Sequence, residues 1–131
     1  MFKVLGDIQL AKNFRLAEFV CAEGRGEILL DMELVYKLQA LRDFVGCPVN
    51  ITSGYRSTTW NTKVGGSKNS QHMLGKAADI QVPGFSPEKI AEFARYIGFT
   101  GIGLYDTHTH VDVRSNTGGK PYVFWDYRTK K

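Results

Sequence analysis

The chain has 131 residues, of which 43% are hydrophobic and 23% charged, and its formal net charge is +4. This length and composition predict one ordinary globular domain spanning residues 1–131. No apolar run approaches the ~20 residues of a membrane span, and the first residues lack the apolar stretch of a secretory signal, so we expect no membrane partner. The positive charge favours anionic partners only mildly.

The first half of the chain predicts one clear helix among less regular segments. Residues 31–46 repeat leucines at helical spacing, Asp31 is a suitable N-cap, and a glycine closes the segment. Before this helix, residues 13–24 predict an irregular segment or a short helical turn lying on the core. After it, residues 48–57 predict a short strand ending in a turn. Residues 61–70 predict a loop, because glycine, serine and asparagine recur there without periodicity.

The second half of the chain mixes strands with one more helix. Residues 76–82 alternate as a strand does, and residues 86–98 begin with a serine N-cap and a proline at the first helical position. Residues 100–105 and 109–114 predict two further strands, and the aromatic segment 120–127 predicts a last one. Because the later strands follow one another closely, we expect an α+β fold with a mostly antiparallel sheet and helices packed on one side.

The two cysteines, Cys21 and Cys47, form no closely spaced pair. Without an export signal we expect two free, buried thiols, because cysteines inside cells are kept reduced. The sequence leaves open whether they bond to each other, and it assigns no chemistry to either.

All three histidines, His72, His108 and His110, lie in the second half of the chain. Because side chains alternate along a strand, His108 and His110 share one face, while Thr109, Val111 and Val113 point the other way, into the core. The same alternation in the preceding strand turns Asp79 away from the core. If these two strands are neighbours, Asp79 and His110 meet on one polar face, and His72 enters from the loop before.

Two imidazoles and a carboxylate that meet at one point predict a zinc site. Imidazole nitrogen and carboxylate oxygen are normal Zn²⁺ ligands, and three protein ligands leave a fourth position open, as in catalytic sites. The small residues Gly75 and Ala77 keep the approach open for a substrate. The alternative is a tight turn that enters a core strand, with histidines that are exposed or merely hydrogen-bonded. Spacing alone leaves both interpretations open.

Four motifs are together similar to one known family. Residues 70–79 (SQHMLGKAAD) match S-x-H-x-x-G-x-A-x-D, and residues 110–114 (HVDVR) match a closing H-x-D motif. Residues 51–61 (ITSGYRSTTWN) and 14–24 (FRLAEFVCAEG) match further upstream. The set resembles the zinc D-alanyl-D-alanine carboxypeptidase family, which includes the peptidoglycan endopeptidases of phage lysins. One such motif is a weak signal, whereas four in the right order over residues 14–114 are a strong one.

The resemblance implies a hedgehog/DD-peptidase-like fold with one metal site. It implies that His72, Asp79 and His110 hold a single Zn²⁺. We expect Asp112 to orient a ligand histidine through the ring nitrogen that does not bind the metal.

The resemblance also implies a residue that faces the substrate, Arg56. A guanidinium there would hold a carboxylate or polarise the scissile carbonyl, because it makes charge-assisted pairs with either group. Tyr55 and Ser70, which belong to the same motifs, are expected to contact the substrate as well. The alternative for Arg56 is a turn residue in a surface salt bridge, which is worth little.

The residue at the position of the general base differs from that in many relatives. They carry a glutamate three residues before the last zinc ligand, where this chain has Thr107. His108 lies two residues before that ligand, as in another branch of the family, and is expected to move a proton or donate a hydrogen bond. Asp106 is the second candidate base, although an aspartate in a turn often caps that turn. The sequence leaves open whether the general base is His108, Asp106 or neither residue.

These features predict a zinc metallopeptidase that cleaves peptidoglycan stem peptides by metal-activated water, as a D-Ala-D-Ala carboxypeptidase or an L-Ala-D-Glu-type endopeptidase. We expect a monomer without a nucleic-acid partner, because no aromatic-and-basic motif of a known module is present. The missing secretory signal fits a phage or prophage lysin that is made in the cytoplasm and acts on the cell wall after release. The alternative is a non-catalytic, zinc-stabilised binding module of hedgehog-like fold.

Overall fold

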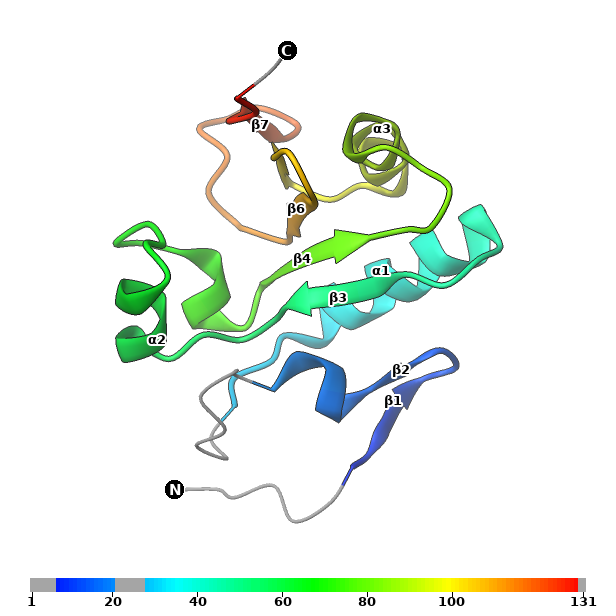
Figure 1. The fold of residues 1–131 in the computed structure, drawn as a ribbon, viewed down its shortest axis with the longest axis horizontal. Coiled ribbons are helices and arrows are strands. Elements are labelled where there is room, and N and C mark those ends of the chain that lie inside the picture. Colours follow the sequence, from blue (N-terminus) through cyan, green and yellow to red (C-terminus); the bar gives the residue numbers. More distant parts are fainter. Residues whose placement is uncertain (1–6, 21–27, 130–131) are drawn as a thin grey trace.

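The computed structural model describes residues 7–20 and 28–129 and builds them around a five-stranded sheet of order β3-β4-β6-β5-β7 (Figure 1). The strands are β3 (Asn50–Ser53), β4 (Ala77–Gln81), β5 (Gly101–Leu104), β6 (Thr109–Asp112) and β7 (Val123–Asp126). A separate two-stranded sheet pairs β1 (Gln9–Ala11) with β2 (Phe14–Arg15). Neighbouring strands of the large sheet are antiparallel except β5 and β7, which run parallel. The predicted α+β class with a mostly antiparallel sheet is therefore confirmed.

Three α-helices and two short 3-10 helices lie among the described residues. They are α1 (Met32–Val45), α2 (Thr58–Lys63), α3 (Pro87–Ile97), η1 (Leu16–Phe19) and η2 (Gln71–Leu74). The side chains of Asp31 and Ser86 accept hydrogen bonds from backbone N–H groups in the first turns of α1 and α3, as the sequence predicts. Gly46 and Gly98 end these helices in the left-handed conformation, with φ of 70° and 103°.

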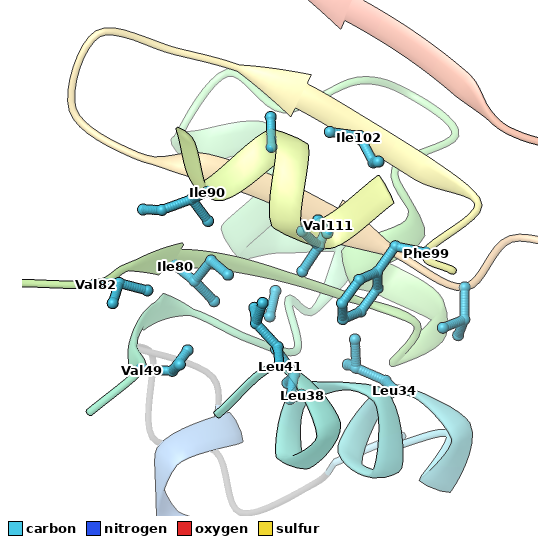
Figure 2. Packing of buried hydrophobic residues seen from close by; sticks show 14 of the residues in the cluster. Leu34, Leu38, Leu41, Val49, Ile80, Val82, Ile90, Phe99, Ile102 and Val111 are labelled. Atoms are coloured by element: carbon cyan, nitrogen blue, oxygen red, sulfur yellow. The ribbon is translucent and has the colours of Figure 1, made fainter. Parts of the chain in front are cut away.

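The hydrophobic core lies on one face of the sheet, between the strands and the helices α1 and α3 (Figure 2). Leu34, Leu38 and Leu41 of α1 point toward Ile80 of β4 and Val111 of β6. The other buried members of this cluster are Phe14, Phe19, Val35, Val49, Ala78, Val82, Ile90, Ala91, Ala94, Phe99, Ile102, Leu104 and Val113. Because both long helices cover the same face, the opposite face of the sheet is left for polar side chains.

Two segments differ from the expectation. Residues 61–70 were expected to form a loop, but their first three residues belong to α2, which Ser57 caps by accepting a hydrogen bond from a backbone N–H of the first turn. The strand expected over residues 109–114 ends at Asp112. The reason is that the backbone N–H of Arg114 turns back to the Asp112 carboxylate, at 3.1 Å, and so does not continue the strand ladder.

The remaining expectations concern the N-terminal segment and the cysteines. Within residues 13–24, the described part forms β2 and the short helical turn η1, which packs on the core as expected. Residues 21–24, including Cys21, lie outside the described residues. Cys47 is a free thiol, as expected, but it is half-buried, so the expectation of a buried thiol was wrong for Cys47. Among the described residues, no helix is both long and apolar enough to cross a membrane.

Candidate metal centre and active site

The polar face of the sheet brings together three ionisable residues from different elements. Asp79 on β4 is paired directly with His110 on β6, and His72 comes from η2. One ligand atom from each of the three lies within 4.8 Å of the others. Their exposed fractions are only 2–6%. The expected meeting of His72, Asp79 and His110 is therefore found, but Asp79, which turns away from the core as expected, enters a buried polar layer and not solvent.

The orientation of His72 is set by the short helix that carries it. Ser70 caps η2 by accepting a hydrogen bond from the His72 backbone N–H at 3.2 Å, and Gly75 ends it at a φ of 69°. The His72 Nδ1 lies 2.7 Å from the carbonyl oxygen of Gly54. A carbonyl only accepts, so Nδ1 carries the proton. The lone pair of Nε2 is then turned toward Asp79 Oδ1, 3.2 Å away.

His110 is held by a buried carboxylate that binds its Nε2, whereas His72 is held through its Nδ1. Its Nε2 donates to Asp112 Oδ2 at 2.7 Å, which leaves the Nδ1 lone pair facing Asp79 Oδ1 at 3.3 Å. Asp112 is fully buried and is also bound by Arg114 at 2.7–3.2 Å. Burial opposes the charge of Asp112, but the hydrogen bonds from His110 and Arg114 outweigh it and lower its pKa to about 2. A Cβ at Gly101 would overlap the Asp112 carboxylate, so the strand needs glycine at that position.

The donor set formed by these side chains suits a divalent cation. His72 and His110 each use one ring N–H on another acceptor and turn the remaining nitrogen lone pair toward Asp79. Burial disfavours the Asp79 carboxylate, yet its contacts with the His110 and His72 rings hold its pKa well below its usual range. Three converging electron-pair donors repel one another unless a cation lies between them. Two imidazoles and one carboxylate are ordinary zinc ligands, and both histidines have the hydrogen-bonded second nitrogen that metal-bound histidines usually show.

Arg56 lies at the edge of this cluster and is fixed at three points. Its Nε donates to Ser53 Oγ at 3.2 Å, its Nη1 to Asn61 Oδ1 at 3.3 Å and its Nη2 to Asp79 Oδ2 at 3.1 Å. A guanidinium has five N–H donors, so each terminal nitrogen keeps one N–H beyond these bonds. Arg56 also lines the cavity described below. The structure therefore brings Arg56 to the cluster, as expected.

Asn61 is a buried partner of Arg56 that the sequence motif does not reveal. It is 3% exposed, and while its Oδ1 accepts from Arg56, its Nδ2 donates to the carbonyl oxygen of Ser67 at 2.8 Å. Its own carbonyl accepts from the backbone N–H of Gly66 at 2.8 Å, and a Cβ at Gly66 would overlap the Asn61 side chain. Asn61 thus joins Arg56 to the loop that follows α2. Its helical position and buried amide become visible only in the fold.

His108 lies in the turn before β6, with its ring at the cluster. Its Nε2 is 3.7 Å from Asp79 Oδ2, and its ring stacks on Tyr105 at a centroid distance of 4.6 Å and an interplanar angle of 9°. The Thr107 hydroxyl lies 3.2 Å from its Nδ1. Burial lowers the pKa of His108, although the charge of Asp79 opposes this shift. A neutral imidazole with a free nitrogen toward the cluster suits proton transfer.

Two other predicted residues are not brought to the cluster. The Asp106 carboxylate accepts hydrogen bonds from the backbone N–H and the hydroxyl of Thr129, at 3.0 and 2.8 Å, and Asp106 does not line the cavity. Tyr55 is 9% exposed, and its backbone N–H donates to the carbonyl oxygen of Phe19. Tyr55 likewise does not line the cavity, whereas Ser70 does. Neither Asp106, the second candidate base, nor Tyr55, the expected substrate contact, therefore lines the cavity.

An open cavity of about 700 Å³ lies over the cluster. One side is formed by the loop after α2 and the start of η2, and the other by aromatic residues near β7. The residues that line it are Arg56, Val64, Gly65, Gly66, Ser67, Asn69, Ser70, Gln71, His72, Asp79, Tyr105, His108, His110, Arg114, Trp125 and Tyr127. Trp125 lies 5.0 Å from the His110 ring and donates its indole N–H to the Tyr105 hydroxyl at 3.0 Å. A substrate that enters this cavity meets the two histidines and Asp79 at its base.

Comparison with known proteins agrees with this geometry. The model of the family described as Peptidase M15 matches residues 12–113, which hold the cluster, Arg56 and His108. The chain belongs to the peptidase M15 family. The family resemblance expected from the four sequence motifs is thereby confirmed.

Two relatives of this M15 chain are informative. The zinc D-Ala-D-Ala carboxypeptidase of Streptomyces albus G is 40% identical over 96 residues, which cover 69% of this chain and 36% of the relative. The probable peptidoglycan L,D-endopeptidase MepK of Haemophilus influenzae is 26% identical over 126 residues, which cover 85% of this chain and 68% of the relative. The chain thus spans about a third of the first relative and about two thirds of the second.

Proposed function

We propose that this chain is a zinc-dependent peptidase that cleaves the peptide stems of peptidoglycan. The single observation that carries the proposal is the convergence of two imidazole lone pairs on one buried carboxylate, at the base of an open cavity. One relative is named as a zinc D-Ala-D-Ala carboxypeptidase and the other as a probable peptidoglycan L,D-endopeptidase, which supports the proposal. The formal charge of +4 is compatible with an anionic cell wall.

The residues that would hold the metal are His72 through Nε2, His110 through Nδ1 and Asp79 through its carboxylate. A bound Zn²⁺ in a site with three protein ligands polarises a carbonyl oxygen and activates water at neutral pH. Asp112 holds the His110 ring in the orientation that presents Nδ1, and the carbonyl of Gly54 does the same for His72.

Arg56 and His108 would perform the remaining chemistry of peptide hydrolysis. The N–H groups that Arg56 has left after its three bonds would donate to the scissile carbonyl or to the negative charge that develops on its oxygen. His108 would accept a proton at Nε2 and pass it to the leaving amine. We favour His108 over Asp106 as the proton carrier, because both carboxylate oxygens of Asp106 already accept hydrogen bonds from Thr129.

The proposal is tested by digestion of purified peptidoglycan and of soluble stem peptides with the zinc-loaded protein, followed by mass spectrometry. We expect cleavage that stops on chelation and returns on addition of zinc. The mass of the products separates loss of a terminal D-Ala from a cut between L-Ala and D-Glu. Intact stems in the presence of stoichiometric zinc would contradict the peptidase and leave the zinc-stabilised binding module as the function.

A further inference from the structure

A second guanidinium, that of Arg114, lies at the cavity. The proposed chemistry gives it no contact with substrate. Its Nε and Nη2 bind the Asp112 carboxylate at 2.7–3.2 Å. Its Nη1 donates no hydrogen bond to a described residue. The side chain is 22% exposed and lines the cavity. Of its five N–H donors, Arg114 therefore keeps three that do not bind Asp112, two on Nη1 and one on Nη2.

The plane of this guanidinium is fixed by Trp125. The Arg114 guanidinium carbon lies 5.0 Å from the Trp125 ring centroid, a cation–π distance. Trp125 in turn lies across Gly103 of β5, where a Cβ would overlap the indole, and its N–H is bound by the Tyr105 hydroxyl. A guanidinium held on one edge by a carboxylate and on one face by an indole is preorganised, so little side-chain entropy is lost when it binds a ligand.

Arg114 and Arg56 lie on different sides of the metal-binding cluster. Arg56 follows β3 and bonds Asp79, whereas Arg114 follows β6 and contacts Trp125 of β7, at the other edge of the sheet. These two permanent cations are balanced by two carboxylates: Asp79, which is the one carboxylate among the described residues that line the cavity, and the buried Asp112, which pairs with Arg114. A cation bound to the cluster would make this balance more positive. The cavity is therefore complementary to a peptide that carries negative charge.

We infer that Arg114 is a specificity-determining residue that binds a carboxylate of the substrate peptide while Arg56 engages the scissile carbonyl. This inference rests on the proposed function, because it takes the substrate to be a peptidoglycan stem peptide. Stem peptides offer two carboxylates of the same chemistry, the α-carboxylate of the γ-linked D-Glu and the C-terminal carboxylate. Either one pairs with the free edge of a guanidinium in a charge-assisted hydrogen bond.

The test uses four synthetic pentapeptides of sequence L-Ala-γ-D-Glu-L-Lys-D-Ala-D-Ala, with the D-Glu α-carboxylate and the C-terminus each as free acid or as carboxamide. Cleavage (kcat and KM) and binding by calorimetry are measured for the zinc-loaded wild type and for Arg114→Gln and Arg114→Lys. In the wild type, we expect amidation of one of the two carboxylates to weaken binding and raise KM by about tenfold, since a charge-assisted bond is lost. The position at which amidation matters identifies the source of the carboxylate.

The Arg114→Gln variant should bind the acid and the amide within about threefold of each other, and Arg114→Lys should keep part of the preference because it keeps the charge. Zinc content measured on each variant separates this effect from a disturbance of Asp112 and His110, which would lower zinc content and affect all four peptides equally. A wild type that treats the four peptides alike, or an Arg114→Gln variant that keeps the full preference, would overturn the inference.

Failure of the proposed function gives a different result. A zinc-loaded protein that cleaves none of the peptides, yet binds the acid form more tightly than the amide only while Arg114 is present, contradicts the peptidase and supports the carboxylate site. If Arg114→Gln does not fold, the variant Trp125→Leu replaces it, since it leaves the charge in place and removes the surface that fixes the guanidinium. We then expect a reduced preference between acid and amide, and an unchanged preference would count against the inference.

Discussion

The two faces of the five-stranded sheet use the same strands for opposite purposes. On the face toward α1 and α3, Ile80 and Val111 are completely buried among leucines and a phenylalanine. On the other face, their sequence neighbours Asp79 and His110 are 6% exposed and lie among charged and hydrogen-bonding groups. The same strands, at alternating positions, therefore supply both the hydrophobic core and the site.

The difference between the faces shows where stability and reactivity originate. The apolar face is stabilised by non-directional packing, so the free energy of unfolding lost on substitution depends on the side-chain volume that is removed. The polar face is held by directional bonds, such as the pairing of Arg114 with Asp112, and its side chains are fixed by partners and not by shape. Substitutions on the apolar face should therefore change the free energy of unfolding while leaving zinc binding and turnover largely intact, and substitutions on the polar face should do the reverse.

The largest effect is expected for His110→Ala, which removes a donor from the polar face. The variant should lose stoichiometric zinc and all measurable peptidase activity, because two donors hold zinc far more weakly than three. Metal analysis after dialysis and a muropeptide assay measure this. The matched control is Val111→Ala, one residue along on the apolar face, which should keep its zinc. Normal zinc content in His110→Ala would refute the ligand assignment.

A smaller loss is expected for His108→Ala, which leaves the three donors in place. Turnover should fall by about 10²–10⁴-fold, the usual contribution of a general acid or base, while zinc content stays at the wild-type level. Asp106→Ala is the comparison variant, and its turnover should be close to wild type because Asp106 does not line the cavity. If kcat is unchanged in His108→Ala and falls in Asp106→Ala, the two roles are exchanged.

A next smaller effect is expected for Gly101→Ala, which places a methyl group where the Asp112 carboxylate lies. Displacement of Asp112 releases the His110 ring, so zinc affinity should fall by about 10–100-fold, as for other residues that orient metal ligands. Competition with a chelator of known affinity measures it. Gly103→Ala is the matched control on the same strand, since its methyl group meets Trp125 and should raise KM more than it lowers zinc affinity. Equal zinc affinity in the two variants would argue against a positioning role for Asp112.

The smallest effect on the site is expected for Ile80→Ala, on the apolar face beside Asp79. The free energy of unfolding should fall by about 2–5 kcal/mol, because a fully buried side chain is replaced by a cavity. Denaturant titration of the zinc-loaded protein measures it, and kcat below the unfolding transition should stay within about twofold, since additive behaviour is usual where no partner is shared. A collapse of zinc content in this variant would show that the two faces are coupled.

Much of the fold and of the metal site was predictable from local pattern. The caps at Asp31 and Ser86 and the closing glycines bound the two long helices, because these residues act on the backbone next to them. The alternation of side chains placed Asp79 and His110 away from the core. The helix α2 escaped prediction because it has only six residues and no apolar period, and a serine cap decides where it begins.

The surroundings of the site were not predictable in the same way. The sequence names His72 and His110 as candidate ligands, but it does not say which ring nitrogen each presents. That choice depends on the carbonyl of Gly54 and on Asp112, which reach the rings only after the chain has folded.

Local spacing in the sequence was enough to predict the alternation of side chains along the strands, the helix caps and three side chains of the types that zinc prefers. What required the folded chain was the pairing of β4 with β6, the link from Asn61 to Arg56, and the placement of Trp125 against Arg114. The physical reason is the distance along the sequence over which each kind of interaction acts. Periodicity and capping act within a few residues, whereas the partners of a buried polar side chain come from strands and loops far away in the sequence.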